Sequence, residues 1–196
     1  MERGLQSANS SPAMNPQDTL SRDQILAALA RLDELLRAKG IIGELCIFGG
    51  AAMVLAFDAR ESTRDVDAIF VPKEDVLNAA RKVADEFGFD PDWMNSGVAG
   101  FVSPQGQVTS EGMPIFDNLR VMRPTTEYLL AMKCLASRVA TLGIRGDRMD
   151  VITLLRELCI TDAATACDIV AGYYKESQLP PKVRYFIEET IHEMNS

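Results

Sequence analysis

The beginning of the chain changes from a helical to a strand-like hydrophobic pattern. Ser21 and Gln24 have the spacing of a capping box, and apolar residues then recur at helical intervals until Gly40. The next apolar run is short, covers residues 45–48, and ends in two glycines. Such a run is typical of a buried strand that is broken by glycine. The sequence therefore predicts a helix followed by a strand.

Three further elements are expected before the middle of the chain. Residues 51–57 favour a helix, and residues 66–71 form an apolar run that Pro72 closes, which predicts a second strand. Residues 73–87 place apolar side chains on one helical face and stop at Gly88. The front half thus has the order helix, strand, helix, strand, helix.

The remaining residues become increasingly helical. Residues 89–114 are rich in Gly, Pro, Ser and Asp, with short strands expected around residues 98–102, and residues 115–122 have the pattern of a strand. Four helices are expected after that, over residues 125–142, 147–158, 161–174 and 180–191. The predicted fold class is α+β. A disordered N-terminal segment (1–20) precedes an α/β domain (21–123) and an all-helical C-terminal region (124–196).

Composition excludes several classes of protein. The net charge of −8 disfavours a general nucleic-acid-binding protein, and there is no apolar run long enough to span a membrane. The four cysteines lie in apolar segments without a Cys-x-x-Cys pair, which favours buried thiols in a reducing cytoplasm. The single histidine, His192, is four residues from the C-terminus, so a histidine-based catalytic triad or metal site is not expected.

One part of the chain is locally basic. Residues 115–156 contain seven basic residues against four acidic ones: Arg120, Arg123, Lys133, Arg138, Arg145, Arg148 and Arg156 against Asp117, Glu127, Asp147 and Asp150. This stretch either faces phosphates, as one wall of a cleft, or contributes only helix ends and solvated faces.

Two glycines follow the first predicted strand. Gly49 and Gly50 allow the backbone to approach a ligand closely, and the following helix presents N–H groups and partial positive charge to a phosphate. We expect Gly50→Val to block that approach through its side chain and through loss of a positive φ. The alternative is an ordinary tight turn.

Two aspartates flank the start of the second predicted strand. Strand side chains alternate between faces, so Asp65 and Asp67 point the same way, with Cα atoms about 7 Å apart, while Val66 points into the core. Two carboxylates on one face repel each other unless a cation lies between them, and Mg²⁺ prefers such oxygen ligands. The alternative is a pair of solvated aspartates.

Together these motifs resemble a known signature. A Gly-Gly turn, fourteen intervening residues and Asp-Val-Asp entering an apolar strand resemble the nucleotidyltransferase superfamily with the DNA polymerase β-like fold, at a slightly longer spacing than the commonest form. The two alanines after the glycines, and the Arg-x-x-Thr-Arg-Asp-Val-Asp run at residues 60–67, look more specifically like a bacterial branch. That branch contains toxins of abortive-infection and type IV toxin–antitoxin systems. The resemblance implies a small mixed-sheet nucleotidyltransferase-type domain before the helical region.

The helical region adds to this resemblance, which covers residues 49–155 and more loosely 45–191. Lys133 lies in a helix and is followed by an Asp-x-x-Asp motif, Asp147 to Asp150, as in this branch. Lys133 would contact the phosphates of a nucleotide, and should then point toward Asp65 and Asp67. It is otherwise a snorkelling lysine or a structural partner of Asp150. Arg138 and Asp147 are expected to be supporting salt-bridge residues, and Arg64 a structural or edge residue.

Enzymes of this superfamily usually have a third carboxylate on a neighbouring strand. Asp117 is the best candidate in this sequence and Glu111 the next.

The resemblance implies a metal-dependent nucleotidyltransferase. Mg²⁺ (or Mn²⁺) on Asp65 and Asp67 would bridge the phosphates of a nucleoside triphosphate (NTP), with an RNA, a protein or a small molecule as the hydroxyl acceptor. The first alternative is a catalytically weak or silent module that binds an antitoxin-like partner protein. The second is a helical nucleic-acid-binding protein, which the acidic total disfavours.

Overall fold

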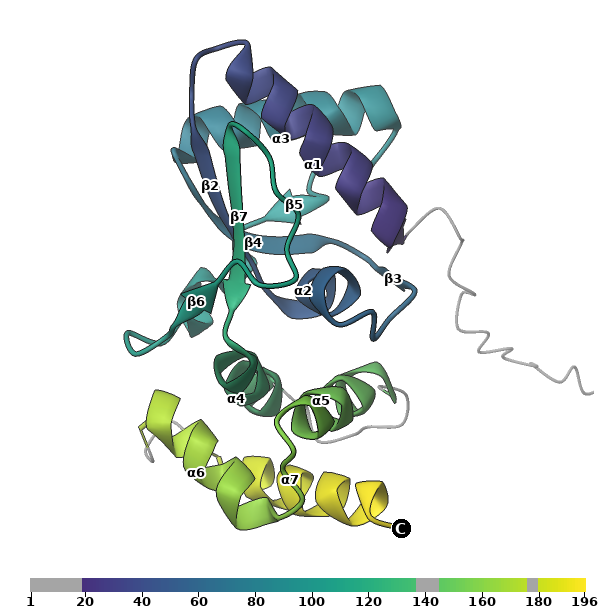
Figure 1. Ribbon diagram of the computed structural model, residues 1–196, viewed down its shortest axis with the longest axis vertical. Helices are drawn as coiled ribbons and strands as arrows, with labels where there is room; N and C mark the ends of the chain where they lie inside the picture. Colours follow the sequence, from purple (N-terminus) through teal and green to yellow (C-terminus); the bar gives the residue numbers. More distant parts are fainter. Residues whose placement is uncertain (1–18, 137–144, 176–179) are drawn as a thin grey trace, which may run out of the picture.

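The computed structural model describes residues 19–136, 145–175 and 180–196. These residues form seven α-helices and a five-stranded mixed sheet, together with a small two-stranded sheet. The sheets and the first three helices lie at one end of the molecule, and the last four helices gather at the other (Figure 1). The expected combination of helices with a mixed sheet is therefore confirmed.

The first helix, α1 (Arg22–Arg37), begins at the predicted capping box. The Gln24 amide donates to Ser21 Oγ, and the Ser21 amide donates to Gln24 Oε1. Its predicted apolar face is fully buried in the core: Ile25, Leu29, Leu32 and Leu36. This burial fixes α1 against the sheet, which the chain enters directly afterwards.

The order of strands in the main sheet is β5-β4-β2-β7-β6. The central strand β2 is antiparallel to β4 and parallel to β7, while β5 runs parallel to β4 and β6 antiparallel to β7. The strands are β2 (Gly43–Ile47), β4 (Val66–Val71), β5 (Met94–Asn95), β6 (Val108–Thr109) and β7 (Leu119–Pro124). Because β2 and β4 are antiparallel, the end of β2 lies beside the start of β4, and the Phe48 amide donates to the Asp67 carbonyl at 2.8 Å.

The connection from β2 to β4 is made by α2 (Gly49–Ala56) and β3 (Ser62–Thr63). Strand β3 pairs with β1 (Leu20–Ser21), the residues immediately before α1. This connection brings Thr63 into a buried position next to the first turn of α2. The Thr63 hydroxyl also donates to the Asp65 carbonyl at 3.3 Å, so the segment between β3 and β4 lies against the glycines.

Helix α3 (Lys73–Phe87) has the bounds that the sequence predicts. It starts after Pro72 and ends at Gly88, whose φ of 69° lies in the left-handed region that glycine tolerates best. Helices α1 and α3 pack on one face of the sheet (Figure 1). They approach it so closely that a Cβ at Gly43 would lie 2.7 Å from Leu36 Cδ1.

Trp93 fixes the short strand β5 beside the start of β4. Its side chain is buried, its indole Nε1 donates to the Ala80 carbonyl at 3.0 Å, and its own carbonyl accepts from the Val66 amide at 2.7 Å. The ring also contacts Phe89 edge-on, with centroids 5.7 Å apart. These contacts hold β5 at the end of the sheet where β4 begins.

Two expectations for the middle of the chain are corrected. Residues 98–102 are not strands, because the 3₁₀ helix η2 (Gly97–Phe101) occupies this stretch; Asn95 Oδ1 accepts from the Gly97 amide and turns the backbone there. The strand expected at 115–122 is shifted to β7, and Ile115 is 96% exposed in the preceding loop. That loop ends where the Asn118 amide donates to the buried Asp33 carboxylate.

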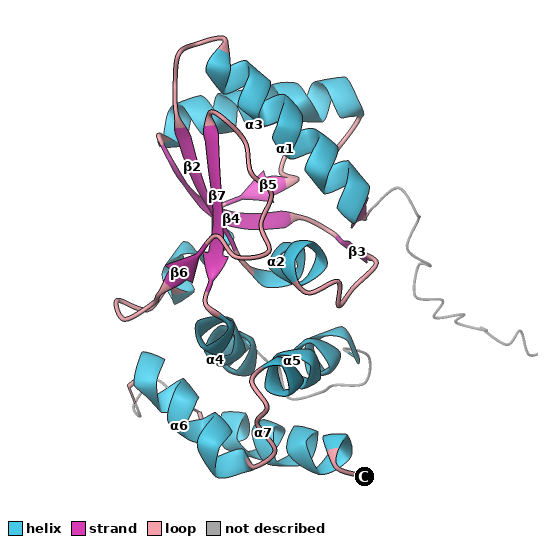
Figure 2. Cartoon of the chain, viewed as in Figure 1, coloured by secondary structure: helices cyan, strands magenta, loops and turns pink. Residues whose placement is uncertain are grey.

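The last four helices form the second part of the molecule (Figure 2). Helix α4 follows β7 directly and packs against the other three. The helices are α4 (Thr126–Ala136), α5 (Arg145–Glu157), α6 (Ala163–Tyr173) and α7 (Pro181–Met194). The expected continuation of the first of these helices over residues 137–142 falls outside the described residues. In the part of the chain that is described, no helix has both the length and the apolar character needed to cross a membrane.

Candidate functional site

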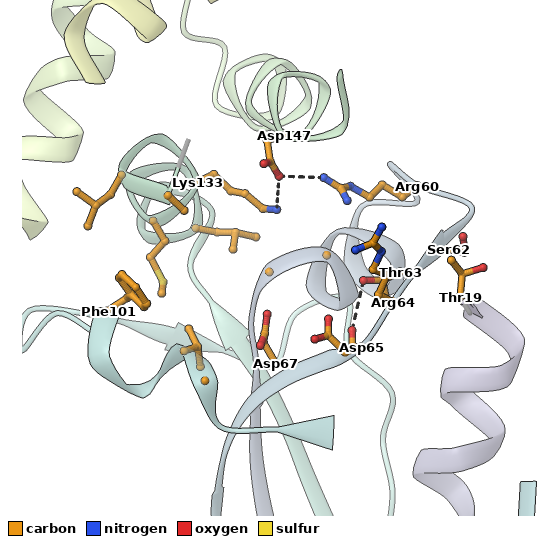
Figure 3. Close-up of a pocket in the computed structure, with 18 residues that line it drawn as sticks. Thr19, Arg60, Ser62, Thr63, Arg64, Asp65, Asp67, Phe101, Lys133 and Asp147 are labelled. Carbon is orange, nitrogen blue, oxygen red and sulfur yellow. Dashed lines mark hydrogen bonds and ion pairs between the residues drawn. The ribbon is translucent and has the colours of Figure 1, made fainter. Parts of the chain in front are cut away.

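A pocket of about 730 Å³ lies between the sheet end and the helices α4 and α5 (Figure 3). Five predicted site residues line it together: Gly49, Gly50, Asp65, Asp67 and Lys133. Its side chains fall into four groups: the carboxylates, the cations of Arg60, Arg64 and Lys133, the hydroxyls of Thr19, Ser62 and Thr63, and an apolar group on η2 and α4 that includes Val98, Phe101, Leu129, Met132 and Leu135. Residues from both parts of the fold thus meet in one cavity.

Asp65 and Asp67 face the pocket, while Val66 between them is fully buried, as the strand alternation predicts. The Asn95 side-chain amide donates to Asp65 Oδ2 at 3.1 Å and so orients that carboxylate. Partial burial, together with the nearby charge of Asp65, raises the pKa of Asp67, while Asn95 and the Lys133 ammonium act in the opposite direction. Both carboxylates are half-buried at the mouth of the pocket.

Asp67 lies between two glycines. Gly49 has a φ of 61°, and a Cβ added there would lie 3.1 Å from Asp67 Oδ2. A Cβ at Gly97, on the other side, would lie 3.9 Å from Asp67 Oδ1. Both oxygens of this carboxylate therefore lie close to backbone that carries no side chain, and a side chain at Gly49 would crowd the carboxylate.

Gly49 and Gly50 form the first turn of α2. The residue at the N-cap, Phe48, supplies no side-chain hydrogen bond to this turn, so the amides at the helix start can serve an anion. The positive φ belongs to Gly49 and not to Gly50, which corrects our expectation. Gly50 is required for a different reason: a Cβ there would lie 2.5 Å from Thr63 Oγ1.

We expect Gly50→Ala to lower the free energy of unfolding by about 1–3 kcal/mol, which is typical of overpacking. The added methyl group would push Thr63, whose hydroxyl donates to the Asp65 carbonyl, and so disturb the aspartate pair. Urea unfolding measures the change. Gly172→Ala is the matched control, because a Cβ at Gly172 meets nothing within 4 Å and alanine favours helix. Equal stability of the Gly50 and Gly172 variants would contradict this packing.

Lys133 lies on the pocket wall and is also paired with Asp150. Its Nζ is 2.6 Å from Asp150 Oδ2, and Arg60 donates to both oxygens of the same carboxylate at 2.6 Å. Asp150 is fully buried, so this ion cluster joins the connection after α2 to the helices α4 and α5. The phosphate-facing and structural interpretations of Lys133 are therefore compatible, because its ammonium also acts on Asp67.

Asp147, one turn before Asp150, belongs to the same cluster. Its Oδ1 lies 3.3 Å from Arg60 Nη2 and 3.7 Å from Lys133 Nζ, and its side chain is 37% exposed toward the pocket (Figure 3). The expected salt-bridge role of Asp147 is thus observed, whereas Arg138 lies outside the described residues. Arg64, expected at an edge, is exposed and lines the pocket.

Helices α4 and α5 bring part of the basic stretch 115–156 to one wall of the pocket, as expected, but most of the basic side chains that the structure describes there point elsewhere. Among its basic residues whose side chains the structure describes, only Lys133 lines the cavity. Arg120 pairs with Glu44, Arg148 pairs with Glu189 and Glu193 on α7, and Arg123 is buried over the Phe57 ring. The other pocket cations, Arg60 and Arg64, come from the segment before β4. The net charge of a stretch of sequence therefore did not predict which cations line the pocket.

The structure does not bring Asp117 to the site. Asp117 is exposed in the loop before β7, next to Asn118, whose carbonyl accepts from the Gly43 amide at the start of β2. The aspartate pair lies at the opposite end of that strand. Glu111 is exposed beside Arg123 and also lies outside the pocket. Among the described residues, no cluster of three or more acidic, histidine or cysteine side chains is arranged to hold a metal ion.

Two residues of the site, Arg60 and Asn95, were given no role from the sequence, although Arg60 begins the Arg-x-x-Thr-Arg-Asp-Val-Asp run. Arg60 contacts Asp150 and Asn95 contacts Asp65, while the expected pairing of Lys133 with Asp150 is observed. We compared the chain with protein-family models, curated proteins and solved structures. None of them matches it. A function therefore has to be built on the chemistry of the pocket.

Proposed function

We propose that this protein is a metal-dependent nucleotidyltransferase that moves a nucleoside monophosphate from an NTP to a hydroxyl acceptor. The observation that supports it is that Asp65, Asp67, Lys133 and the turn at Gly49 and Gly50 line one pocket. Carboxylates for a metal, amides for phosphate and a cation for phosphate are the parts that such a reaction needs. The resemblance to the nucleotidyltransferase superfamily, and to its toxin-containing bacterial branch, is part of this proposal.

The carboxylates fit Mg²⁺ that arrives with a nucleotide. Protein sites for this ion commonly supply only one or two carboxylates, while phosphates and water complete the shell. Asp65, held by Asn95, and Asp67, bordered by Gly49 and Gly97, offer two carboxylates that line the pocket. Mg²⁺ or Mn²⁺ bound there would offset phosphate charge and stabilise the leaving pyrophosphate.

The chain's own groups would position the triphosphate. The amides at the start of α2 and the cations of Lys133 and Arg60 border the same space and attract phosphate oxygens. The acceptor hydroxyl would bond to the α-phosphorus as the bond to pyrophosphate breaks, and its proton would pass to solvent. RNA, protein and small-molecule hydroxyls all satisfy this chemistry.

The apolar side of the pocket suits a nucleobase. Phe101 is 59% exposed and borders the cavity with Val98 and Met132. Stacking a base on an aromatic ring contributes about 1–3 kcal/mol, and any base can stack. We propose that Phe101 covers the base of the NTP.

Replacing Phe101 by Ala should therefore weaken NTP binding about tenfold, which is about 1.4 kcal/mol. Binding of inorganic triphosphate should be unchanged, because no base is present. Isothermal titration measures both ligands, and Tyr185→Ala is the control, because Tyr185 is an aromatic side chain on α7 that is 66% exposed and does not line the pocket. If the Phe101→Ala variant binds the NTP and inorganic triphosphate more weakly by the same factor, Phe101 does not contact the base.

The proposed function is tested in two steps. Isothermal titration with each NTP, with and without Mg²⁺, asks whether the pocket binds nucleotide. Incubation with α-labelled NTP and RNA or protein then asks whether label moves to an acceptor with release of pyrophosphate. Mg²⁺-dependent binding followed by labelling is the expected result, and the absence of both would refute the proposal.

A second candidate function is a nucleotide-binding module with weak or no transfer. It is favoured because, among the described residues, no third carboxylate joins Asp65 and Asp67. Such a module would act through a partner protein of the kind found in toxin–antitoxin pairs. Binding of nucleotide without any pyrophosphate release would favour this candidate over the enzyme.

A further inference from the structure

The two carboxylates of the ion cluster have different surroundings. Asp150 is fully buried, does not line the pocket, and makes three contacts of 2.6 Å to Arg60 and Lys133. Asp147 lies farther from the same two cations, at 3.3 Å from Arg60 and 3.7 Å from Lys133. Its side chain is 37% exposed and lines the pocket. Asp150 is therefore a fixed, buried partner of the two cations, whereas Asp147 is loosely held and faces the cavity.

We infer that Asp147 competes with a ligand polyphosphate for Arg60 and Lys133, and that a bound polyphosphate displaces its carboxylate. This makes Arg60 a second polyphosphate-binding residue beside Lys133. The inference deepens the proposed function and rests on it only for the chemical class of the ligand, a polyphosphate.

The charges of the cluster support this exchange. Arg60 and Lys133 carry two positive charges, and Asp147 and Asp150 carry two negative ones, so the cluster has no net charge to attract an anion. When Asp147 moves away, one positive charge is left facing the pocket. Partly exposed ion pairs contribute little stability, so a phosphate group can replace the carboxylate at low cost.

The positions of the side chains support it as well. Asp147, Arg60 and Lys133 lie together across the cavity from Asp65 and Asp67 (Figure 3). Arg60 donates from Nε and Nη2 to Asp150, which holds the guanidinium in place, and the same Nη2 lies 3.3 Å from Asp147 at the pocket wall. A phosphate oxygen that reached Nη2 at the usual charge-assisted distance of about 2.7–2.9 Å would be a stronger partner than the Asp147 carboxylate at 3.3 Å.

The test is Asp147→Asn, which keeps the shape and removes the charge. We expect it to bind inorganic triphosphate about threefold to tenfold more tightly than the parent, in EDTA, by isothermal titration. The difference should shrink in 1 M salt, where screening acts over about 3 Å. The control is Glu189→Gln, which removes the same charge from a partner of Arg148 outside the pocket and should bind like the parent. Thermal melting establishes that both variants are folded.

Each outcome decides one question. Parent-like or weaker binding by Asp147→Asn overturns the inference and makes Asp147 a positioning residue. An equal gain in Glu189→Gln also overturns it, because net charge would then explain the result. A gain confined to Asp147→Asn supports it. If that gain appears while the parent shows no Mg²⁺-dependent nucleotide binding, the proposed function fails and the competition survives.

Discussion

Replacing Asp65 and Asp67 together by Asn should abolish Mg²⁺-dependent nucleotide binding without loss of stability. Neutral amides are poor ligands for Mg²⁺, so the effect on binding should exceed a hundredfold and reach the limit of isothermal titration. Stability should be equal or higher by about 1 kcal/mol, because two partly shielded like charges are removed. A matched control replaces two exposed aspartates outside the pocket, Asp85 and Asp168, by Asn.

The gain in stability should depend on pH. The folded protein raises the pKa of Asp67 above its ordinary value of 3.8, so its charged form is disfavoured by folding. The loss of stability caused by the charged Asp67 is absent when this carboxyl is protonated in both the folded and the unfolded protein. It grows as pH rises through the raised pKa. The advantage of the double variant should therefore be present at pH 7 and vanish below about pH 4. Nucleotide binding equal to that of the parent would show that the site is assigned wrongly.

Replacing Asp150 by Ala should lower the free energy of unfolding by about 3–5 kcal/mol, the usual cost of breaking a buried ion pair from one side. The change leaves Arg60 and Lys133 close together with only the loosely held Asp147 between them. Urea unfolding at pH 7 measures the loss, and Asp168→Ala on the exposed surface of α6 is the control. A loss below 1 kcal/mol would mean that the cluster does not hold the two parts of the fold together.

Local signals explain which elements could be predicted from the sequence. Helix α3 is bounded by Pro72 and Gly88, and α1 by the capping box at Ser21, so their limits follow from neighbouring residues alone. The 3₁₀ helix η2 was missed because the turn depends on the Asn95 side chain. The start of β7 was missed because it depends on Asp33 of α1, 85 positions before Asn118.

In the site, too, features that depend on neighbouring residues could be predicted, and features that depend on distant residues could not. Glycines and aspartates close in sequence were found because the alternation of β4 and the turn before α2 are local features. Asp117 was chosen for its place within the strand predicted over residues 115–122, but the observed strand β7 starts after it, and the direction of β7 puts it at the far end of β2. Arg60 and Asp150 are ninety positions apart, and only the packing of α5 against the connection after α2 brings them together.

Trp93 gives this protein a built-in optical reporter. It is the only tryptophan in the sequence, so the indole emission comes from one buried position. Asn95, two residues after Trp93, donates to Asp65, and the Val66 amide donates to the Trp93 carbonyl. A movement of the aspartate pair should therefore also move the backbone around the indole. Titrating Mg²⁺ and nucleotide while recording fluorescence intensity and wavelength would then follow events at Asp65 without any added label.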